Sequence, residues 1–502
     1  MISGPHIALS VPELLIEILS HLSTEELAVT ALVCKAWTDL AVDTKWRTQK
    51  IKLSRLLANL APIEQSKTRP TSVILVPQTP ITHDHWHRFL EHYANRITRL
   101  VFDMQFDEAS ITLIATLLER FGGRFGDNLI SLNWSYDIHN DDCTGTLIDL
   151  FPGTRLQEID FRSEEQFHLA GTSSSNPLSQ LAHRAPHISQ LENVHDSFDF
   201  SVFPRLRYLL HRGSLSTSDY HNLSCCQDLA VLFLRWTEGQ VTPFHGTDTT
   251  FPRLERFVLY SPDDEAEEMV IRSVMPALRF LTYSKRRAMG PFTVPLLNNI
   301  LRTSPLLEKI SITVAVTPSQ LELVQHHGVR NLSFHGLYRL RSPLDLLAVS
   351  RFFPKLEKLT VFFDRTRWPH CRQSTWHWNA LPALVDQLRH LQYLTIPLHV
   401  PVSSLSGTPK ETTPLQSLIS LKFQVLYIRR VDIDPFVTYL AMLFPEVHSI
   451  EVKVLFEVPD EGVDGMDFVL GDSRAFVNRF FRYRGQIRGS QISDGGPVEE
   501  IH

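Results

Sequence analysis

The stretch FPKLEKLTVFF, residues 353–363, is the clearest copy of a pattern that recurs through the chain. An apolar residue stands two positions after the proline, and further apolar residues follow it at three and five positions. Similar copies are FPRLERFVLY (251–260), MPALRFLTY (275–283) and FPEVHSIEVKV (444–454). The spacing of two between the later apolar positions predicts a short β-strand, because successive side chains of a strand point to opposite faces. Each copy is therefore a turn followed by a strand.

The pattern recurs at irregular intervals of 18 to 35 residues. Its first apolar position falls at Ile97, Leu129, Leu156, Ile188, Leu206, Leu229, Leu254, Leu278, Leu307, Val329, Leu356, Leu391, Leu418 and Val447. Several of the segments between these positions have helical periodicity, for example 108–121, 293–304 and 434–444. Such a period predicts a solenoid of helix–turn–strand units, with parallel strands on the concave face and helices on the convex face.

This region resembles the leucine-rich-repeat solenoids, and most of all those of fungal F-box proteins. In regular repeats, the position eight residues after the first apolar one holds Asn or Cys, and none of the fourteen copies has either residue there. The resemblance therefore implies an α/β fold with an irregular leucine-rich-repeat solenoid, in which the turn backbone is satisfied in some other way.

Residues 11–47 form a different, purely helical pattern. Leu14, Leu15, Ile18, Leu19 and Leu22 are predicted to share one face of a first helix that begins near Pro12. Ser23 and Glu26 have the spacing of a capping box and are expected to start a second helix. A third helix should include Trp37 and Trp46.

This stretch resembles the F-box through Val11-Pro12-Glu13, Ile18-Leu19, Leu22, Val33-Cys34-Lys35-Ala36-Trp37 and Trp46-Arg47. F-boxes bind the Skp adaptor, which sits on a cullin scaffold. The resemblance implies an adaptor-binding surface made of Val11, Pro12, Ile18, Leu19, Leu22, Val33, Cys34 and Trp37. It also implies that Cys34 is a small buried apolar residue.

Composition and charge indicate a globular protein that binds other proteins. Of the 502 residues 43% are hydrophobic, and 49 basic residues face 55 acidic ones, which is not the excess of positive charge that nucleic-acid binding needs. We see neither a secretory signal nor an apolar run of membrane-spanning length, and the five cysteines have no disulfide spacing. We therefore expect a cytoplasmic or nuclear location and no nucleic-acid or membrane partner.

No motif for catalysis, cofactor binding or metal binding stands out. His83, His85 and His87 could bring two imidazoles together on a helix, but no third ligand accompanies them, and a solvated helix start is the preferred interpretation. The neighbours Cys225 and Cys226 lack the separation of a redox or metal pair. We expect no catalytic residue, no cofactor and no metal.

Two charged runs and one loop are candidates for contacts. The acidic run 263–268 and the basic run 285–287 occupy similar places in consecutive repeats and could pair, lie on a solvated rim or face a partner, and the rim is the preferred interpretation. The longest interval contains Trp368, Arg372, Trp376 and Trp378, which are residue types typical of interface anchors. These four are the predicted target-binding residues, and local core packing of the tryptophans is the alternative.

The predicted organisation is an F-box at 8–50, a helical connector and linker at 51–72, a solenoid at 73–484 and a disordered tail at 485–502. The resemblance implies a non-catalytic, substrate-recognition subunit of a Skp-cullin-F-box ubiquitin ligase. Its partners would be the Skp adaptor, the cullin scaffold and an unidentified protein target. The alternative is a leucine-rich-repeat scaffold or adaptor protein whose F-box does not recruit a cullin.

Overall fold

The fold is taken from a computed structural model of the chain, which separates into two compact units, residues 1–242 and 243–502. Each unit is described by itself. The structure describes residues 11–48, 50–60, 63–69, 72–135, 150, 155–162, 177–194, 199–213, 215–236, 248–285, 292–313, 328–335, 352–362, 376–377, 381, 387–399, 415–428, 432–457, 468–470 and 473–493.

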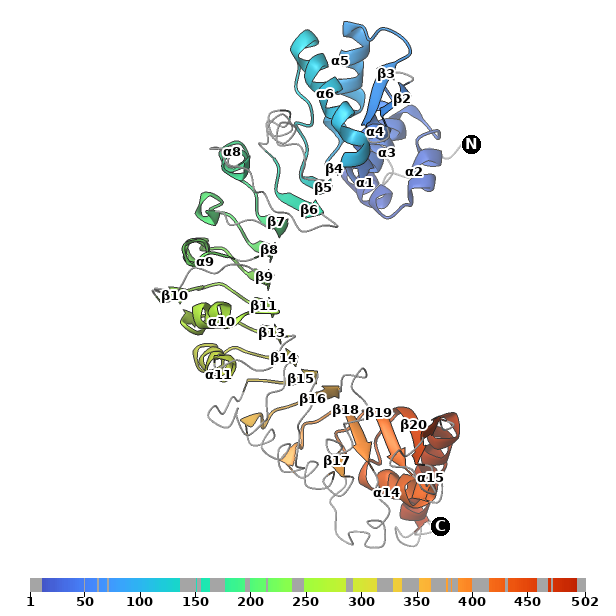
Figure 1. The fold of residues 1–502 in the computed structure, drawn as a ribbon. Coiled ribbons are helices and arrows are strands. Elements are labelled where there is room, and N and C mark those ends of the chain that lie inside the picture. The colour runs from blue at the N-terminus through green and yellow to red at the C-terminus, as the bar shows by residue number, and fades with distance from the viewer. Residues whose placement is uncertain are drawn as a thin grey trace, which may run out of the picture. The chain divides into compact units, whose positions relative to one another are not determined.

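Unit 1 begins with helices and continues as a sheet of parallel strands (Figure 1). Its elements are α1 (Pro12–Ser20), α2 (Thr24–Thr30), α3 (Lys35–Thr48), β1 (Ile51–Lys52), α4 (Leu53–Leu57), β2 (Ile63–Arg69), β3 (Ser72–Pro77), α5 (His83–His92), η2 (Ala94–Arg96), β4 (Arg99–Asp103), α6 (Met104–Phe121), β5 (Ser131–Ser135), β6 (Glu158–Arg162), α8 (Pro177–Arg184), β7 (Gln190–Val194), η3 (Phe200–Val202), β8 (Tyr208–Arg212), α9 (Thr217–Ser224) and β9 (Val231–Arg235). Strand β1 pairs with β4, and each strand from β4 to β9 pairs in parallel with the next.

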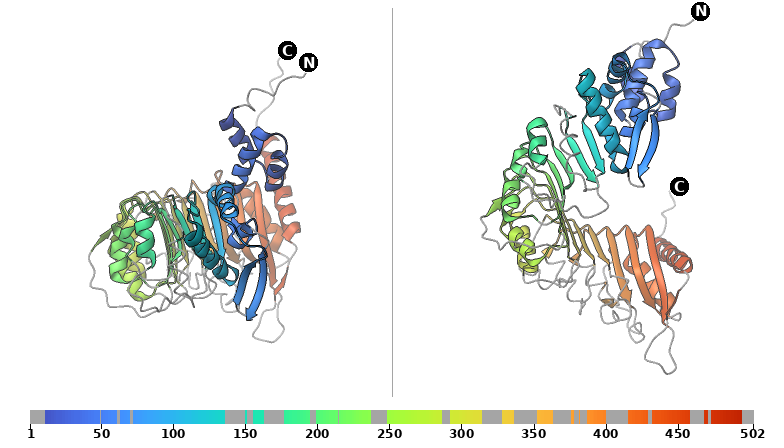
Figure 2. Two further views of the ribbon diagram at one scale, coloured as in Figure 1. Left: turned by 90° about the horizontal axis from the view of Figure 1, so that it is seen from above. Right: turned by 45° about the horizontal axis from the view of Figure 1, so that its top comes forward.

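Unit 2 likewise consists of parallel strands joined to helices (Figures 1 and 2). Its elements are β10 (Thr249–Thr250), β11 (Arg256–Tyr260), α10 (Asp264–Ile271), β12 (Ser273–Val274), β13 (Phe280–Ser284), α11 (Thr293–Thr303), β14 (Lys309–Thr313), β15 (Asn331–His335), β16 (Lys358–Phe362), β17 (Trp376–His377), β18 (Tyr393–His399), β19 (Ser420–Ile428), α14 (Ile433–Leu443), β20 (Ser449–Glu457), β21 (Phe468–Leu470) and α15 (Ser473–Ser493). Strands β11, β13, β14, β15, β16, β18, β19 and β20 pair in parallel in this order.

The predicted repeat pattern is confirmed at all fourteen positions. Every first apolar residue, from Ile97 to Val447, is buried, and a parallel strand begins two residues after each one. The next two apolar positions of a copy also point into the core, as Leu281 and Tyr283 do in β13. The α/β leucine-rich-repeat solenoid predicted from the sequence is therefore present, with α10 and α11 on one face of the sheet in unit 2.

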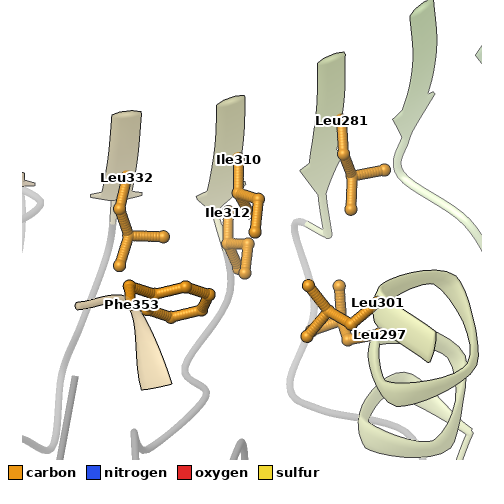
Figure 3. A pocket seen from close by; sticks show the side chains of 7 residues that line it. All are labelled: Leu281, Leu297, Leu301, Ile310, Ile312, Leu332 and Phe353. Atoms are coloured by element: carbon orange, nitrogen blue, oxygen red, sulfur yellow. The ribbon is translucent and has the colours of Figure 1, made fainter. Parts of the chain in front are cut away.

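The core between strands and helices is closely packed. Leu281, Ile310 and Leu332 project from three neighbouring strands toward Leu297 and Leu301 of α11, as Figure 3 shows. The void between them has a volume of about 10 Å³, which is at the lower limit for a single water molecule. Its lining is wholly apolar, so this space is packing and not a ligand site.

Backbone hydrogen bonds join successive turns just before the strands. In unit 2 the amide of Arg279 donates to the Glu255 carbonyl, Glu308 to Arg279 and Arg330 to Glu308, at 2.8 to 2.9 Å. Unit 1 repeats the arrangement, with Arg207 donating to Ser189 and Ala230 to Arg207. At this end of the strands the turn backbone is thus satisfied by the neighbouring repeat, without a ladder of Asn or Cys side chains.

Two segments differ from the sequence-based expectation. The expected helical connector and linker at 51–72 contains the helix α4 but also the strands β1 and β2, and β2 pairs in antiparallel fashion with β3. The run Val73, Ile74, Leu75 and Val76 explains the hairpin, because aliphatic and β-branched residues favour strands. The expected disordered tail from 485 onward is also wrong at its start, since α15 continues to Ser493.

The start of α15 covers the last repeats. The ring of Phe476 lies 6.4 Å from that of Phe436 in α14, and Arg479 forms a 3.2 Å ion pair with Asp434. Phe476 and Phe480 are buried. A helix that closes the end of a repeat array protects its last apolar layer from water.

Candidate functional site

The first three helices form a small core of their own. Leu15 and Leu19 lie one turn apart on α1 and pack with Leu27 of α2 and Ala41 of α3. Leu22, Ala31, Trp37 and Leu40 complete this cluster from its edge. The sequence places these residues at helical spacing, so one stripe of each helix closes the core.

A second set of apolar residues in the same helices is exposed to solvent. Val29, Leu32 and Val33 are 66%, 85% and 61% exposed, and Leu14 and Ile18 of α1 are about half exposed. We call Leu14, Ile18, Val29, Leu32 and Val33 the aliphatic surface. Among the described residues, twelve large apolar side chains are exposed, and six of them, these five and Ile16, lie between positions 14 and 33. Several exposed apolar residues within one small helical module are typical of an interaction surface.

The residues predicted to bind the adaptor divide between the core and the exterior. Leu19 is buried, and Leu22 and Trp37 pack against the core. Pro12, Ile18, Val33 and Cys34 are exposed, and Val11 is half-buried. The single apolar face expected for α1 is therefore wrong, because Leu15 and Leu19 point inward while Leu14 and Ile18 point outward.

Cys34 corrects a second expectation, because its thiol is exposed and not buried. It lies in the turn between α2 and α3, which no described element covers, together with the exposed residues Leu32 and Val33. The sequence reasoning also missed Leu14, Val29 and Leu32 as surface residues. The signal was available, since these three fall outside the stripe of positions 15, 19, 22 and 27.

The turn that orders this surface is held by the predicted capping box. The amide of Ser23 donates to Glu26 Oε2 at 2.7 Å, and the amide of Glu26 donates to Ser23 Oγ at 3.3 Å. Hydrogen bonding of the Glu26 carboxyl to Ser23, first to its backbone amide and then to its side chain, lowers the pKa of this carboxyl. The cap fixes the start of α2 and with it the direction of Val29.

Helix α3 fastens these helices to the rest of unit 1. Arg96 of η2 forms a 3.0 Å ion pair with Asp43, and the hydroxyl of Thr98 donates to the Arg47 carbonyl at 2.7 Å. The rings of Trp46 and Tyr93 meet edge to face, with centroids 5.6 Å apart. The helices are thus packed against the first repeat, while the aliphatic surface is left uncovered by the described part of the chain.

Two other candidates from the sequence lie in unit 1. His83, His85 and His87 lie exposed among the first five residues of α5, which agrees with a solvated helix start. Among the described residues, no group of three or more potential metal ligands occurs. Cys226 is buried, and its desolvation raises the pKa of the thiol to about 12, which keeps it protonated and unreactive. None of the helices in the described ranges has the length and apolarity that a membrane crossing needs.

The two charged runs meet, as one of the sequence interpretations proposes. Lys285 Nζ lies 2.9 Å from Asp264 Oδ1 and 3.0 Å from Glu267 Oε2. Glu267 is fully buried and also accepts hydrogen bonds from the hydroxyls of Tyr283 and Thr293. The solvated-rim interpretation is wrong for Lys285, which is buried, and Arg286 and Arg287 lie outside the described residues. This cluster joins neighbouring repeats.

Of the four predicted target-binding residues, only Trp376 belongs to the part of the chain that the structure describes. Trp376 begins β17, which pairs in parallel with Leu398 and His399 of β18. Trp368, Arg372 and Trp378 lie outside the described residues, so their role stays a prediction. The loop therefore contributes at least one short strand to the sheet of unit 2.

The sheet of unit 2 has a face that the sequence reasoning passed over. Leu281, Ile310 and Leu332 point toward the helices, so their strand neighbours Phe280, Lys309 and Asn331 point the other way. We call this side, across β11 to β18, the open face. The repeated pattern of apolar positions identifies only the inward residues. Because side chains alternate along a strand, the residues between these apolar positions point outward, and the strand register shows which of them lie side by side.

Comparisons with known proteins concern the helical stretch first. A model of the F-box-like family matches residues 12–52. These helices are thus similar to the F-box-like family, and the parallel strands that follow form a leucine-rich-repeat solenoid. No curated protein matches the sequence.

Three similar solved structures follow, and two of them are named as leucine-rich-repeat proteins. A leucine-rich-repeat protein of Leptospira interrogans is 13% identical, with 66% of this chain and 80% of that chain covered and a TM-score of 0.31. The Rad7 and Elc1 complex of yeast gives 17% identity, coverages of 71% and 88% and a TM-score of 0.32. A leucine-rich-repeat-containing protein of Legionella pneumophila gives 10%, coverages of 74% and 100% and a TM-score of 0.30.

Proposed function

We propose that this protein is the substrate-recognition subunit of a Skp-cullin-F-box ubiquitin ligase. Its F-box-like helices bind the Skp adaptor, and its repeat region binds a protein target. The chain contributes no catalytic group in this proposal. It raises the rate of ubiquitin transfer by holding the target near a charged enzyme, since proximity alone can lower a barrier by several kcal/mol.

The aliphatic surface is the observation that supports this proposal most directly. Exposing Val29, Leu32 and Val33 to water is unfavourable, at about 25 cal/mol for each Å² of apolar surface. A partner that covers these side chains recovers that free energy. The surface lies within the 12–52 match to the F-box-like family, whose modules bind Skp adaptors.

The surface and the core of these helices have separate tasks in this proposal. Leu15, Leu19 and Leu27 hold the three helices together, while Ile18 and Val33 meet the adaptor. Pro12, Val11 and Cys34 lie at the margin of the same region and are proposed to be covered on binding. Because α3 is anchored to unit 1 through Arg96 and Asp43, the adaptor is carried by the whole of this unit.

Affinity purification of the intact chain from its native cells tests the proposal. We expect the Skp adaptor and a cullin to copurify, and we expect ubiquitin-modified proteins to accumulate in the eluate when the proteasome is blocked. Recovery of the adaptor without any cullin would favour the non-ligase scaffold. Absence of both would overturn the proposal.

A further inference from the structure

We propose that the open face of unit 2 binds a proline-containing acidic segment of the target, with a carboxylate at every third residue. The inference rests on the proposed function for its biological setting. It is carried by one row of side chains, which strand register places side by side: Arg256, Phe280, Lys309, Asn331, Lys358 and Tyr393.

The row is basic and aromatic, and most of it is exposed. The rings of Phe280 and Tyr393 are 38% and 43% exposed, which is unusual for large apolar side chains in this unit. The ammonium groups of Lys309 and Lys358 form no ion pair with any carboxylate of the described residues. Lys358 Nζ instead lies 5.8 Å from the centre of the Tyr393 ring, a cation–π contact that holds it above the face.

The adjacent row shows that this positive charge is specific to the open face. One residue earlier in each repeat, acidic and basic side chains alternate and pair, with 3.9 Å between Arg279 and Glu308 and 3.0 Å between Arg330 and Glu357. The outward positions of β11, β13, β14, β15, β16 and β18 contain three basic residues and no Asp or Glu. An acidic ligand is therefore the one with complementary charge.

The spacing of the cations selects the shape of the ligand. Arg256, Lys309 and Lys358 lie on every second strand of the paired series, and two strand spacings amount to about 9.6 Å. A polyproline II helix advances about 9.3 Å in three residues and returns each third side chain to the same side. An extended β-strand does not, because its side chains alternate. Carboxylates at positions i, i+3 and i+6 of such a helix thus meet the three cations.

The neighbouring groups suit the same ligand. Phe280 and Tyr393 lie one strand away from the cations and offer exposed rings, which are surfaces that commonly accept proline. The next outward position holds a hydroxyl in five of the six strands, and β11 has Val258 there instead. Thr360 is buried, whereas Thr282, Ser311, Ser333 and Thr395 are partly exposed. A polyproline II segment keeps all its backbone carbonyls free, and these four hydroxyls can donate hydrogen bonds to them.

Fluorescence anisotropy with the intact chain tests the inference. The probe is a labelled peptide, Asp-Pro-Pro-Asp-Pro-Pro-Asp, compared with a peptide of equal composition in which the three aspartates are adjacent. We expect the spaced peptide to bind at least about fivefold more tightly. Lys309→Glu should weaken its binding at least about tenfold, because reversing a charge creates repulsion where a pair is lost.

Lys355→Glu is the matched control, since Lys355 is exposed three residues before Lys358 and lies outside the row. It makes the same change in net charge and should alter affinity less than about twofold. Equal binding of the two peptides, equal loss in both variants or no binding of the spaced peptide at millimolar concentration would overturn the inference. Binding of a phosphoserine-spaced peptide without the aspartate peptide would overturn the assignment to carboxylates. Titration of the Skp adaptor on the same samples shows separately whether the proposed function holds.

Discussion

Two regions of the described chain each expose several large apolar side chains, and the two regions differ in kind. The F-box-like helices expose aliphatic residues such as Leu32 and Val33, without a basic residue among them. The open face of unit 2 exposes the rings of Tyr260, Phe280 and Tyr393 among lysines and hydroxyls. An aliphatic surface gains mainly from burial, whereas a face with spaced charges discriminates between ligands. We therefore expect the helices to bind one constant partner and the open face to select its ligand by charge.

The largest effect is expected inside unit 2, at the buried charge cluster. Lys285→Ala leaves the carboxylate of Glu267 buried without its cation, and breaking such a pair costs about 3 to 5 kcal/mol. Chemical denaturation should show this loss, while adaptor binding by the folded protein should not change. Lys355→Ala at an exposed position is the control and should alter stability by less than about 0.5 kcal/mol.

Adjacent residues of α1 sharpen the distinction between core and surface. Leu19→Ala removes a buried side chain and should cost about 2 to 5 kcal/mol of stability. Ile18→Ala alters an exposed position and should leave the free energy of unfolding within about 0.5 kcal/mol, yet weaken adaptor binding. Circular dichroism melts and adaptor titration on both variants check this. Equal destabilisation would show that Ile18 belongs to the core and would contradict the division between the two faces.

A smaller loss is expected at the capping box that orients α2. Ser23→Ala removes the hydroxyl that accepts the Glu26 amide and should cost about 1 kcal/mol. Ser23→Gly serves as the comparison, because glycine at this position costs only a few tenths of a kcal/mol relative to serine. Hydrogen exchange of residues 24–30 is the measurement, and unchanged protection in Ser23→Ala would mean that packing alone holds the helix.

The smallest expected effect is a pH dependence of folding stability that arises in unit 2. Burial lowers the pKa of His335, whose ring stacks on Phe362 with centroids 4.7 Å apart. The unfolded chain therefore binds this proton more readily, so stability should decline as pH falls below the ordinary histidine pKa of about 6.5. His335→Asn should reduce this slope in thermal melts between pH 7 and 5. A slope that remains the same would assign the pH dependence to other groups.

The repeat architecture was predictable because its signal is local and repeated. A first apolar residue such as Leu356, followed by apolar residues at three and five positions, fixes where a strand begins and which side chains enter the core. The hairpin of β2 and β3 was missed because Pro70 and the polar residues before it drew attention to a linker, although Val73 to Val76 favour a strand. A disordered tail was expected from 485 because the segment is polar and rich in glycine, yet α15 extends to Ser493.

The sites were only partly predictable, since they depend on which residues remain uncovered. The family resemblance identified Ile18 and Val33, which are exposed, but it also included Leu19, which is buried in the core. The division follows from the packing of three helices, which spacing along one helix does not specify. The row on the open face requires the strand register across repeats of unequal length, and Lys309 and Lys358 are 49 residues apart in the sequence.

Calorimetric titration of the purified Skp adaptor into the intact chain tests the central claim most directly. The variant Leu32→Asp/Val33→Asp places charge on the aliphatic surface without touching the core. Burying an unpaired charge in an interface is unfavourable by several kcal/mol. We predict tight binding by the unaltered chain and a loss of at least about 30-fold in the variant, with its melting temperature retained. Leu306→Asp, at another exposed apolar position, should bind as the unaltered chain does. Full binding by the double variant, or no binding by the unaltered chain, would contradict the account.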